Sequence, residues 1–238
     1  MLGLMMSDQL TITALMRHGR TINGSSKIVS VVHDNPRHEY TQAECYDRAG
    51  QLANALKKLG LKHGDVVGTL AWNDYRHMEV YYGVASSGRI IHTINPRLHP
   101  DQLTFIVEDA DDQVLFLDRT FLPAIASLKP KLSHIKHFVL MGGRDAEAEA
   151  MLDGLKFYDE LLDEVEPVSE WPALDENSPA ALCYTSGTTG NPKGVQYSHR
   201  SLVLHSLAGN QPDGIAIAAR DTVLPVVPMF HVNAWSVP

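Results

Sequence analysis

Apolar and polar residues follow two distinct patterns that alternate along the chain. Short apolar or β-branched runs predict buried strands at residues 66–71, 89–93, 114–118 and 138–141. Between these runs, apolar residues at helical spacing predict helices at residues 41–59, 74–87 and 100–110. Strands separated by helices of this length imply right-handed crossovers. The pattern therefore predicts an α/β fold with a doubly wound, mainly parallel sheet flanked by helices.

The helix at 41–59 has clear signals at both ends. Thr41 is followed three residues later by Glu44, which predicts a capping box. Gly60 follows the last apolar position, as glycine often does after a helix.

Outside these elements the pattern is weaker. Residues 27–33 predict a further strand, residues 158–165 predict a helix, and residues 167–179 are rich in Pro and Ser and predict a connection. A junction between subdomains and a surface crossover within one domain both fit residues 165–179.

Residues 184–194 form the most distinctive segment of the chain. Seven of these eleven residues are Gly, Ser or Thr, and Lys193 adds one positive charge. Small residues let backbone N–H groups approach a ligand, hydroxyls add hydrogen-bond donors, and the combination suits a polyphosphate. A flexible linker has a similar composition. The strand-like residues 180–184 and 195–197 on either side favour the phosphate-binding loop.

This loop differs from the common phosphate-binding patterns. A P-loop requires Gly-Lys followed by Ser or Thr, whereas here Pro192 precedes Lys193 and Gly194 follows it. A dinucleotide fingerprint is also absent from the sequence. Residue for residue, the order Thr-Ser-Gly-Thr-Thr-Gly-x-Pro-Lys-Gly resembles the signature of the acyl-adenylate-forming, AMP-binding enzymes.

A second segment supports this resemblance. Residues 225–235 are similar to the next motif of that family, which is centred on Phe230 and His231. In this form the motif is most similar to medium- and long-chain fatty acyl-CoA synthetases. Family members are considerably longer, so the resemblance implies that residues 1–238 are the N-terminal portion of the large adenylation domain. Motifs for adenine, ribose and the catalytic lysine of the C-terminal domain are not found in the sequence.

The resemblance implies two half-reactions that use ATP, Mg²⁺ and coenzyme A. A small-molecule carboxylic acid attacks the α-phosphate of ATP and releases pyrophosphate, and the thiol of coenzyme A then takes the acyl group. Because the family's C-terminal domain is absent, we expect the isolated chain to be inactive. Two alternatives remain open: a non-catalytic nucleotide-binding fragment, and activation of an aryl or other carboxylic acid.

The same resemblance assigns roles to individual residues. Lys193 and His231 are the expected catalytic residues, and Thr185 is also the expected contribution to a magnesium site. Trp235 has a second interpretation, as a core aromatic. The residues expected to bind the nucleotide are Thr185, Ser186, Gly187, Thr188, Thr189, Gly190 and Lys193, and those expected to contact the acid are Val232, Asn233 and Trp235.

Composition limits the other functions. The formal net charge of −8 argues against nucleic acid as a partner. The two cysteines, Cys45 and Cys183, lie on apolar patterns far apart and predict buried thiols. No apolar run is long enough to cross a membrane, so we expect a cytoplasmic protein without a transmembrane segment. A homodimer would be one way to cover exposed apolar surface.

Overall fold

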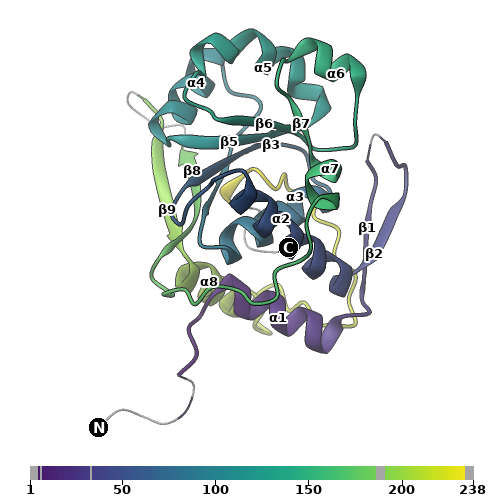
Figure 1. Cartoon of the computed structure of the whole chain (residues 1–238). Coiled ribbons are helices and arrows are strands. Elements are labelled where there is room, and N and C mark those ends of the chain that lie inside the picture. The colour runs from purple at the N-terminus through teal and green to yellow at the C-terminus, as the bar shows by residue number, and fades with distance from the viewer. Residues whose placement is uncertain (1–4, 6, 33, 186–190, 234–238) are drawn as a thin grey trace.

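The computed structural model describes residues 5, 7–32, 34–185 and 191–233. A seven-stranded sheet crosses the middle of the molecule, with helices on both of its faces (Figure 1). The strand order is β7-β6-β5-β3-β4-β8-β9, and neighbours are parallel except for the pair β8 and β9. The strands are β3 (Val66–Leu70), β4 (Ile90–Thr93), β5 (Asp112–Leu117), β6 (His137–Leu140), β7 (Lys156–Phe157), β8 (Pro179–Thr185) and β9 (Lys193–Ser198).

The helices form two layers, as a doubly wound sheet requires. Helices α2, α3 and α7 pack on one face, and α4, α5 and α6 cover the other (Figure 1). Helices α1 and α8 lie beyond α2 and α3 (Figure 1). The helices are α1 (Ile12–Asn23), α2 (Gln42–Lys58), α3 (Tyr75–Ser86), α4 (Pro100–Asp109), α5 (Leu122–Leu128), α6 (Ala146–Met151), α7 (Tyr158–Asp163) and α8 (His199–Gly209), with 3-10 turns at Arg119–Phe121 and Lys129–Lys131.

Two apolar clusters hold the layers together. Alternate residues of one strand face opposite clusters, so Phe116 of β5 packs toward α2 and α3 while Leu115 and Leu117 pack toward α4 and α5. All three side chains are fully buried. The predicted α/β sheet is therefore confirmed, and most predicted elements agree with the structure within two residues.

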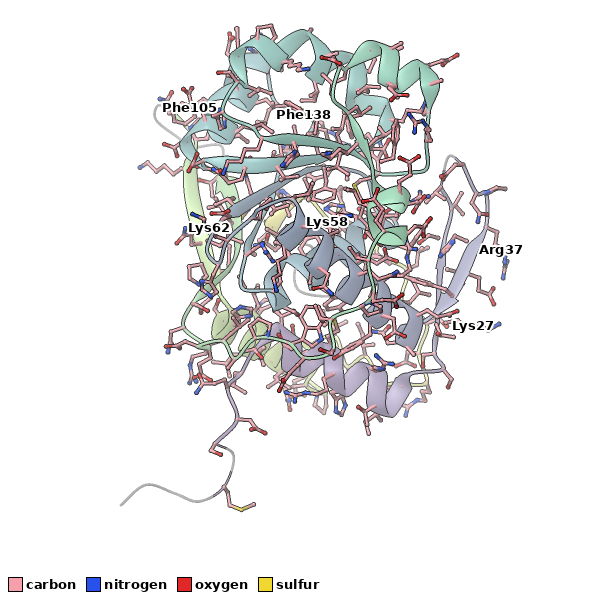
Figure 2. All side chains as sticks on the ribbon, in the orientation of Figure 1. Lys27, Arg37, Lys58, Lys62, Phe105 and Phe138 are labelled. Carbon is pink, nitrogen blue, oxygen red and sulfur yellow. The ribbon has the colours of Figure 1, made fainter. Side chains whose placement is uncertain are left out.

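The strand predicted at residues 27–33 is an exception. It ends at Ser30 and pairs antiparallel with β2 (His38–Thr41), which forms a hairpin with β1 (Lys27–Ser30) apart from the main sheet. Its residues are only partly buried, and Lys27 and Arg37 point away from the body of the molecule (Figure 2). An apolar run alone did not distinguish a hairpin strand from a central one.

The predicted ends of α2 are confirmed. Thr41 and Glu44 form the reciprocal capping box, with Glu44 N donating to Thr41 Oγ1 over 3.2 Å and Thr41 N donating to Glu44 Oε2 over 2.6 Å. Gly60 follows with a φ of 87°, a left-handed conformation that glycine adopts without steric cost.

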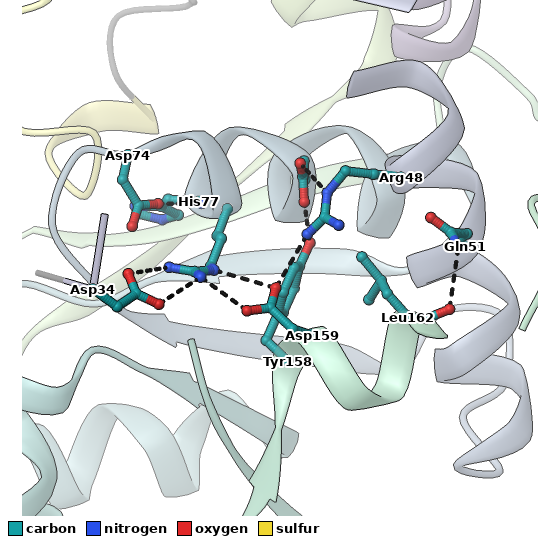
Figure 3. Close-up of polar contacts among 10 residues, drawn as sticks. Asp34, Arg48, Gln51, Asp74, His77, Tyr158, Asp159 and Leu162 are labelled. Atoms are coloured by element: carbon teal, nitrogen blue, oxygen red, sulfur yellow. Dashed lines mark hydrogen bonds and ion pairs between the residues drawn. The ribbon is translucent and has the colours of Figure 1, made fainter. Parts of the chain in front are cut away.

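A buried charge cluster joins α2, α3 and α7 to the segment after β1. Arg48 Nε donates to Glu79 Oε1 over 2.7 Å, and Tyr158 Oη donates to the other carboxylate oxygen over 2.8 Å. Burial raises the pKa of Glu79, and the Arg48 guanidinium opposes this. Figure 3 shows Asp34, Arg48 and Asp159 in the network. The buried charge cluster comprises Arg48, Arg76, Glu79 and Tyr158, with the more exposed carboxylates of Asp34 and Asp159 at its rim.

Within the described residues, no helix is long and apolar enough to cross a membrane. Both cysteines are buried free thiols, as the sequence predicted.

Candidate functional site

The strands on either side of the glycine-rich segment form a hairpin at the carboxyl edge of the sheet. β8 runs parallel to β4, and β9 returns antiparallel to it with Thr185 opposite Lys193. Both flanks are strands, as predicted for a phosphate-binding loop and not for a linker. In open α/β sheets, ligands bind outside the carboxyl ends of the parallel strands. The fold thus presents Thr185 and Lys193, at the facing ends of β8 and β9, at a place suited to a ligand.

Thr185 and Lys193 stand at the two ends of the loop. Both residues are exposed, and the Thr185 hydroxyl donates to the Lys193 carbonyl over 3.5 Å. Among the described residues, no ion pair involves Lys193, so its charge is available to a ligand. The other expected nucleotide-binding residues, Ser186, Gly187, Thr188, Thr189 and Gly190, lie outside the described residues.

Tyr184 fixes the base of this hairpin. Its hydroxyl donates to Asp109 Oδ2 of α4 over 2.7 Å, and its ring lies over Gly194 of β9. A Cβ at position 194 would approach Tyr184 Cζ to 3.1 Å, closer than ordinary contacts. A side chain at position 194 would therefore require Tyr184 to shift by a few tenths of an ångström. Sequence analysis did not identify this role for Tyr184.

The second motif is held at the same edge of the sheet by Asn73. This residue lies between β3 and α3, and its side-chain amide donates to Pro225 O over 3.0 Å and to Val227 O over 2.9 Å. Its side-chain oxygen accepts from Met229 N over 2.6 Å. One side chain thus satisfies three backbone groups of a segment about 150 residues away. Apart from the position of Asn73 after a buried strand, no sequence pattern indicates this contact.

Two further side chains attach the end of the motif. Tyr81 Oη of α3 donates to Met229 O, and Thr93 Oγ1 of β4 donates to Asn233 Oδ1 over 3.3 Å. Thr93 is the register partner of Cys183 in β8, two residues before Thr185. The structure therefore brings Asn233 close to the base of the phosphate-binding hairpin, through β4.

The backbone at the expected acid-binding residues is strained. Val232 and Asn233 have φ angles of 48° and 50°, in the left-handed region that non-glycine residues rarely adopt. For the β-branched Val232 this conformation costs on the order of 1–3 kcal/mol. His231 is exposed and its backbone N–H donates to Pro228 O over 3.0 Å. Trp235 lies outside the described residues.

Buried His77 supports the turn that carries Asn73. Its Nδ1 donates to Trp72 O over 3.0 Å, and its Nε2 lies 3.2 Å from the Thr69 hydroxyl. Burial lowers the pKa of His77 to about 4, so the ring is neutral at physiological pH. Asp74 caps α3 by accepting from His77 N, and burial raises the pKa of Asp74 to about 7. The turn between β3 and α3 is therefore fixed from both sides.

A cleft of about 720 Å³ lies next to this turn, at the carboxyl ends of β3, β5 and β6. Three arginines line it, but each is already paired with carboxylates: Arg76 with Asp34 and Asp159, Arg119 with Asp145 and Glu147, and Arg144 with Glu149 and Glu160. Paired guanidinium groups leave little positive potential for an added anion. The described residues thus point to the hairpin at Lys193 as the better phosphate site.

The expected metal site has one candidate ligand among the described residues. The Thr185 hydroxyl is an oxygen ligand of the kind that Mg²⁺ accepts. In the described ranges, no group of three or more His, Cys, Asp or Glu side chains could hold a metal ion. His134 Nε2 and His137 Nε2 lie 3.3 Å and 3.2 Å from the carbonyl oxygens of Val107 and Leu59. The residues described here do not by themselves form a magnesium site.

Comparisons with known proteins agree on one family. The model of the AMP-binding enzyme family matches residues 20–238. The 3-methylmercaptopropionyl-CoA ligase of Ruegeria lacuscaerulensis is 51% identical over 238 residues, which are 100% of this chain and 44% of that protein. The medium-chain-fatty-acid–CoA ligase of Ectopseudomonas oleovorans is 49% identical over the same shares of both chains.

Solved structures give the same fold. The crystal structure of the anthranilate CoA ligase AuaEII in complex with anthranoyl-AMP matches with a TM-score of 0.74 and 25% identity, over 84% of this chain and 37% of that one. The chain spans less than half the length of the curated relatives it matches.

Proposed function

The chain belongs to the family of AMP-binding enzymes, and from this premise we propose that the natural protein containing it is an acyl-CoA ligase. It would activate a carboxylic acid with ATP and transfer the acyl group to coenzyme A. The observation that carries this proposal is the β8–β9 hairpin, which presents an exposed Thr185 and an exposed, unpaired Lys193 at the ends of the family's loop. This statement about Lys193 refers to the described part of the chain.

In the first half-reaction, a carboxylate oxygen of the acid forms a bond to the α-phosphorus of ATP. The bond from that phosphorus to the bridging oxygen of pyrophosphate breaks, and pyrophosphate leaves with the electron pair. The Lys193 ammonium would stabilise charge that develops on the departing phosphates. Backbone N–H groups of residues 186–190 and the nearby hydroxyls would hold the β- and γ-phosphates. Mg²⁺, when bound, would neutralise phosphate charge, with Thr185 as one of its ligands.

In the second half-reaction, the sulfur of coenzyme A bonds to the acyl carbon of the acyl-adenylate. The carbon–oxygen bond to phosphate breaks, AMP leaves, and the thiol proton is lost.

His231 would orient the carboxylate and the α-phosphate in the first step, since the attacking carboxylate needs no general base. Asn73, Tyr81 and Thr93 would act as positioning residues, because they fix the segment that carries His231.

The substrate we propose is a medium- or long-chain fatty acid. In support, the relative from Ectopseudomonas is named for medium-chain fatty acids and the relative from Ruegeria for 3-methylmercaptopropionyl-CoA, and neither name indicates an aromatic acid. The segment before His231 is also apolar and exposed, with Leu224 81% and Val226 83% exposed. An aryl acid is the competing substrate, because AuaEII binds anthranoyl-AMP at a lower identity to this chain.

The test is acyl-CoA formation by the natural protein with acetate, 3-methylmercaptopropionate, octanoate, palmitate, benzoate and anthranilate. We expect thioester and AMP in equal amounts with octanoate or palmitate, and little product with the aryl acids. Product with 3-methylmercaptopropionate but not octanoate would support the ligase activity and change the proposed substrate from a fatty acid to a short acid. Product with none of the acids would reject the proposed activity on these substrates.

A further inference from the structure

Two polar side chains outside both motifs are buried inside the main sheet. His92 is the third residue of β4, Asp112 is the first residue of β5, and both are 0% exposed. His92 Nδ1 lies 2.9 Å from Asp112 Oδ2 and 3.1 Å from Oδ1. Burial raises the pKa of Asp112, and the nearby imidazole opposes this. A buried pair of this kind adds little net stability, and the best-attested use of such pairs is to fix one arrangement of a fold.

The bond between His92 and Asp112 crosses a strand. β4 and β5 are not neighbours, because β3 lies between them. Gly68 of β3 is the register partner of His92, and a Cβ at Gly68 would lie 2.8 Å from Asp112 Oδ2. The bare backbone of Gly68 therefore leaves the space in which the two side chains meet.

An irregularity at the start of β5 turns Asp112 toward His92. The register of β5 with β3 passes from Asp112 directly to Val114, so Gln113 is an extra residue. Strict alternation would place Asp112 on the same face as Val114, which packs toward α2 and α3. The extra residue reverses this, as β-bulges do when they change the direction of a side chain.

The His92 ring packs against Tyr184 at the base of the phosphate-binding hairpin. The centroids of the two rings are 5.1 Å apart. His92 Nε2 is buried and has no partner within the described residues, so among them Asp112 alone orients the imidazole by hydrogen bonding. The Tyr184 ring lies over Gly194, and the next residue of each strand is one end of the loop. These contacts lead from Asp112 to both ends of the phosphate-binding loop.

We propose that His92, oriented by Asp112, is a positioning residue for the phosphate-binding hairpin. By supporting the ring of Tyr184, it holds Thr185 and Lys193 at the separation that the phosphates of ATP require. His92 acts from inside the sheet and does not touch the nucleotide. This role rests on the proposed ligase function, because ATP is the ligand that the hairpin would bind.

The test uses the natural protein with His92→Leu and Asp112→Leu combined. His92→Leu alone would leave a buried carboxylate unpaired, whereas the double variant removes both partners. In ATP–pyrophosphate exchange, the KM for ATP should rise about tenfold, because a small displacement of binding groups has effects of this size or more. The KM for the acid should stay the same, since Asn73 holds the second motif separately. A lower kcat with both KM values unchanged, which loss of folded protein alone produces, would overturn the proposal.

Three single variants separate orientation from charge and from stability. Asp112→Asn keeps an acceptor for His92 Nδ1 without the charge, so the KM for ATP should stay within about twofold of the wild type. Gly68→Ala displaces Asp112 without removing either partner, and should raise the KM for ATP about threefold. Ile125→Ala is the control, because Ile125 is fully buried in α5 and its loss lowers stability through a cavity. An equal rise in Asp112→Asn and the double variant, or in Gly68→Ala and Ile125→Ala, would contradict the proposal.

Hydrogen exchange tests the positioning without catalysis. The amides of residues 193–196 in β9 should exchange about tenfold faster in the double variant, and as in the wild type in Asp112→Asn and Ile125→Ala. Gly68→Ala gives the same test if the double variant does not fold. Absence of ATP–pyrophosphate exchange in the wild type would reject the ligase function, and this measurement would still test His92. Unchanged exchange of residues 193–196 in the double variant and in Gly68→Ala would overturn the positioning role.

Discussion

Among the single residues, Lys193 has the largest proposed role in catalysis. Lys193 is exposed. It is the first residue of β9 and lies opposite Thr185, the last residue of β8. An ammonium about 4 Å from a phosphate contributes roughly 4 kcal/mol at an effective dielectric of 20. That is enough for one side chain to dominate the stabilisation of a departing pyrophosphate.

Substitution of Lys193 by Ala should lower the rate of ATP–pyrophosphate exchange about 10²–10³-fold, as loss of one preorganised donor does in other enzymes. Stability should be unchanged, because in the described part of the chain no ion pair depends on this side chain. Lys62→Ala is the control, with an exposed lysine away from the hairpin. A loss in Lys193→Ala no larger than in the control would remove Lys193 from the catalytic residues.

His77 gives a prediction on stability and pH. The pKa of His77 is about 4 in the folded protein, whereas an unfolded histidine has its ordinary value of 6.5. Below pH 6.5 the unfolded state therefore takes up the proton first. The contribution of His77 to stability is complete above this pH and is lost as the pH falls toward 4.

The measurement compares wild-type protein with His77→Gln by chemical denaturation. Between about pH 7 and pH 5, the free energy of unfolding of the wild type should fall by about 2 kcal/mol more than that of the variant. The contribution of Asp74 to the pH dependence of stability has the opposite sign, since its folded pKa is raised to about 7. Asp74 is present in both proteins, so its contribution does not affect the comparison. Parallel pH profiles for the two proteins would mean that His77 is not held neutral in the fold.

At the scale of elements, the strands and helices of the main sheet were predictable because their apolar periodicity matches their burial. In β5 and α3, the apolar residues that form the pattern in the sequence are those that pack in the core. Helix α1 was missed because it buries little more than Thr13 and Met16. Residues 27–33 predicted a strand but not its pairing with β2, because a short apolar run does not reveal its neighbours.

The two functional motifs were found from the sequence, whereas the side chains that hold them in place were not. The motifs are contiguous runs with unusual composition, but Asn73, Tyr81 and Thr93 act through contacts over 140 residues or more. Such contacts leave no local pattern in a single sequence. Tyr184 is a similar case, because its role depends on Asp109 and on the bare backbone of Gly194.

Asn73→Ala should release the second motif. The three hydrogen bonds of the amide contribute about 1 kcal/mol each, so local opening of residues 225–233 should become easier by about 2–3 kcal/mol. Hydrogen exchange measures this as lost protection at Met229 and His231. The KM for the acid should also rise, since the segment that carries His231 is no longer fixed.

Asn54→Ala is the matched control for Asn73→Ala. Asn54 also donates from its amide to a distant carbonyl, Glu166 O, over 2.9 Å, but lies away from both motifs. Unchanged exchange of residues 225–233 in Asn73→Ala, or an equal change in Asn54→Ala, would show that Asn73 does not hold the motif.

At the scale of the whole molecule, the sheet links a buried interior to its functional edge. Its carboxyl edge carries the hairpin and the second motif, and the pair of His92 and Asp112 lies inside the sheet, with His92 against Tyr184. The buried charge cluster lies between the helices of one layer and joins α2, α3 and α7. It fixes α3, and with it the turn at Asn73.

Arg48→Met should therefore destabilise the whole fold. Glu79 is fully buried, and without its ion-pair partner Arg48 its charge would be left with neutral tyrosine hydroxyls such as that of Tyr158. Removal of one member of such a buried pair costs about 3–5 kcal/mol in the free energy of unfolding. Denaturant titration measures this. Lys58→Met is the control, because the pair Lys58–Glu164 is 57% exposed at each side chain and its loss should not change stability measurably.

The central claim is that the hairpin at Lys193 belongs to an enzyme that adenylates a carboxylic acid. ATP–pyrophosphate exchange by the natural protein, with octanoate present or absent, tests it most directly. We expect exchange that requires the acid, does not require coenzyme A, and is about 10²–10³-fold slower in Lys193→Ala. Exchange without any acid, or none with octanoate, palmitate, 3-methylmercaptopropionate or benzoate, would contradict it.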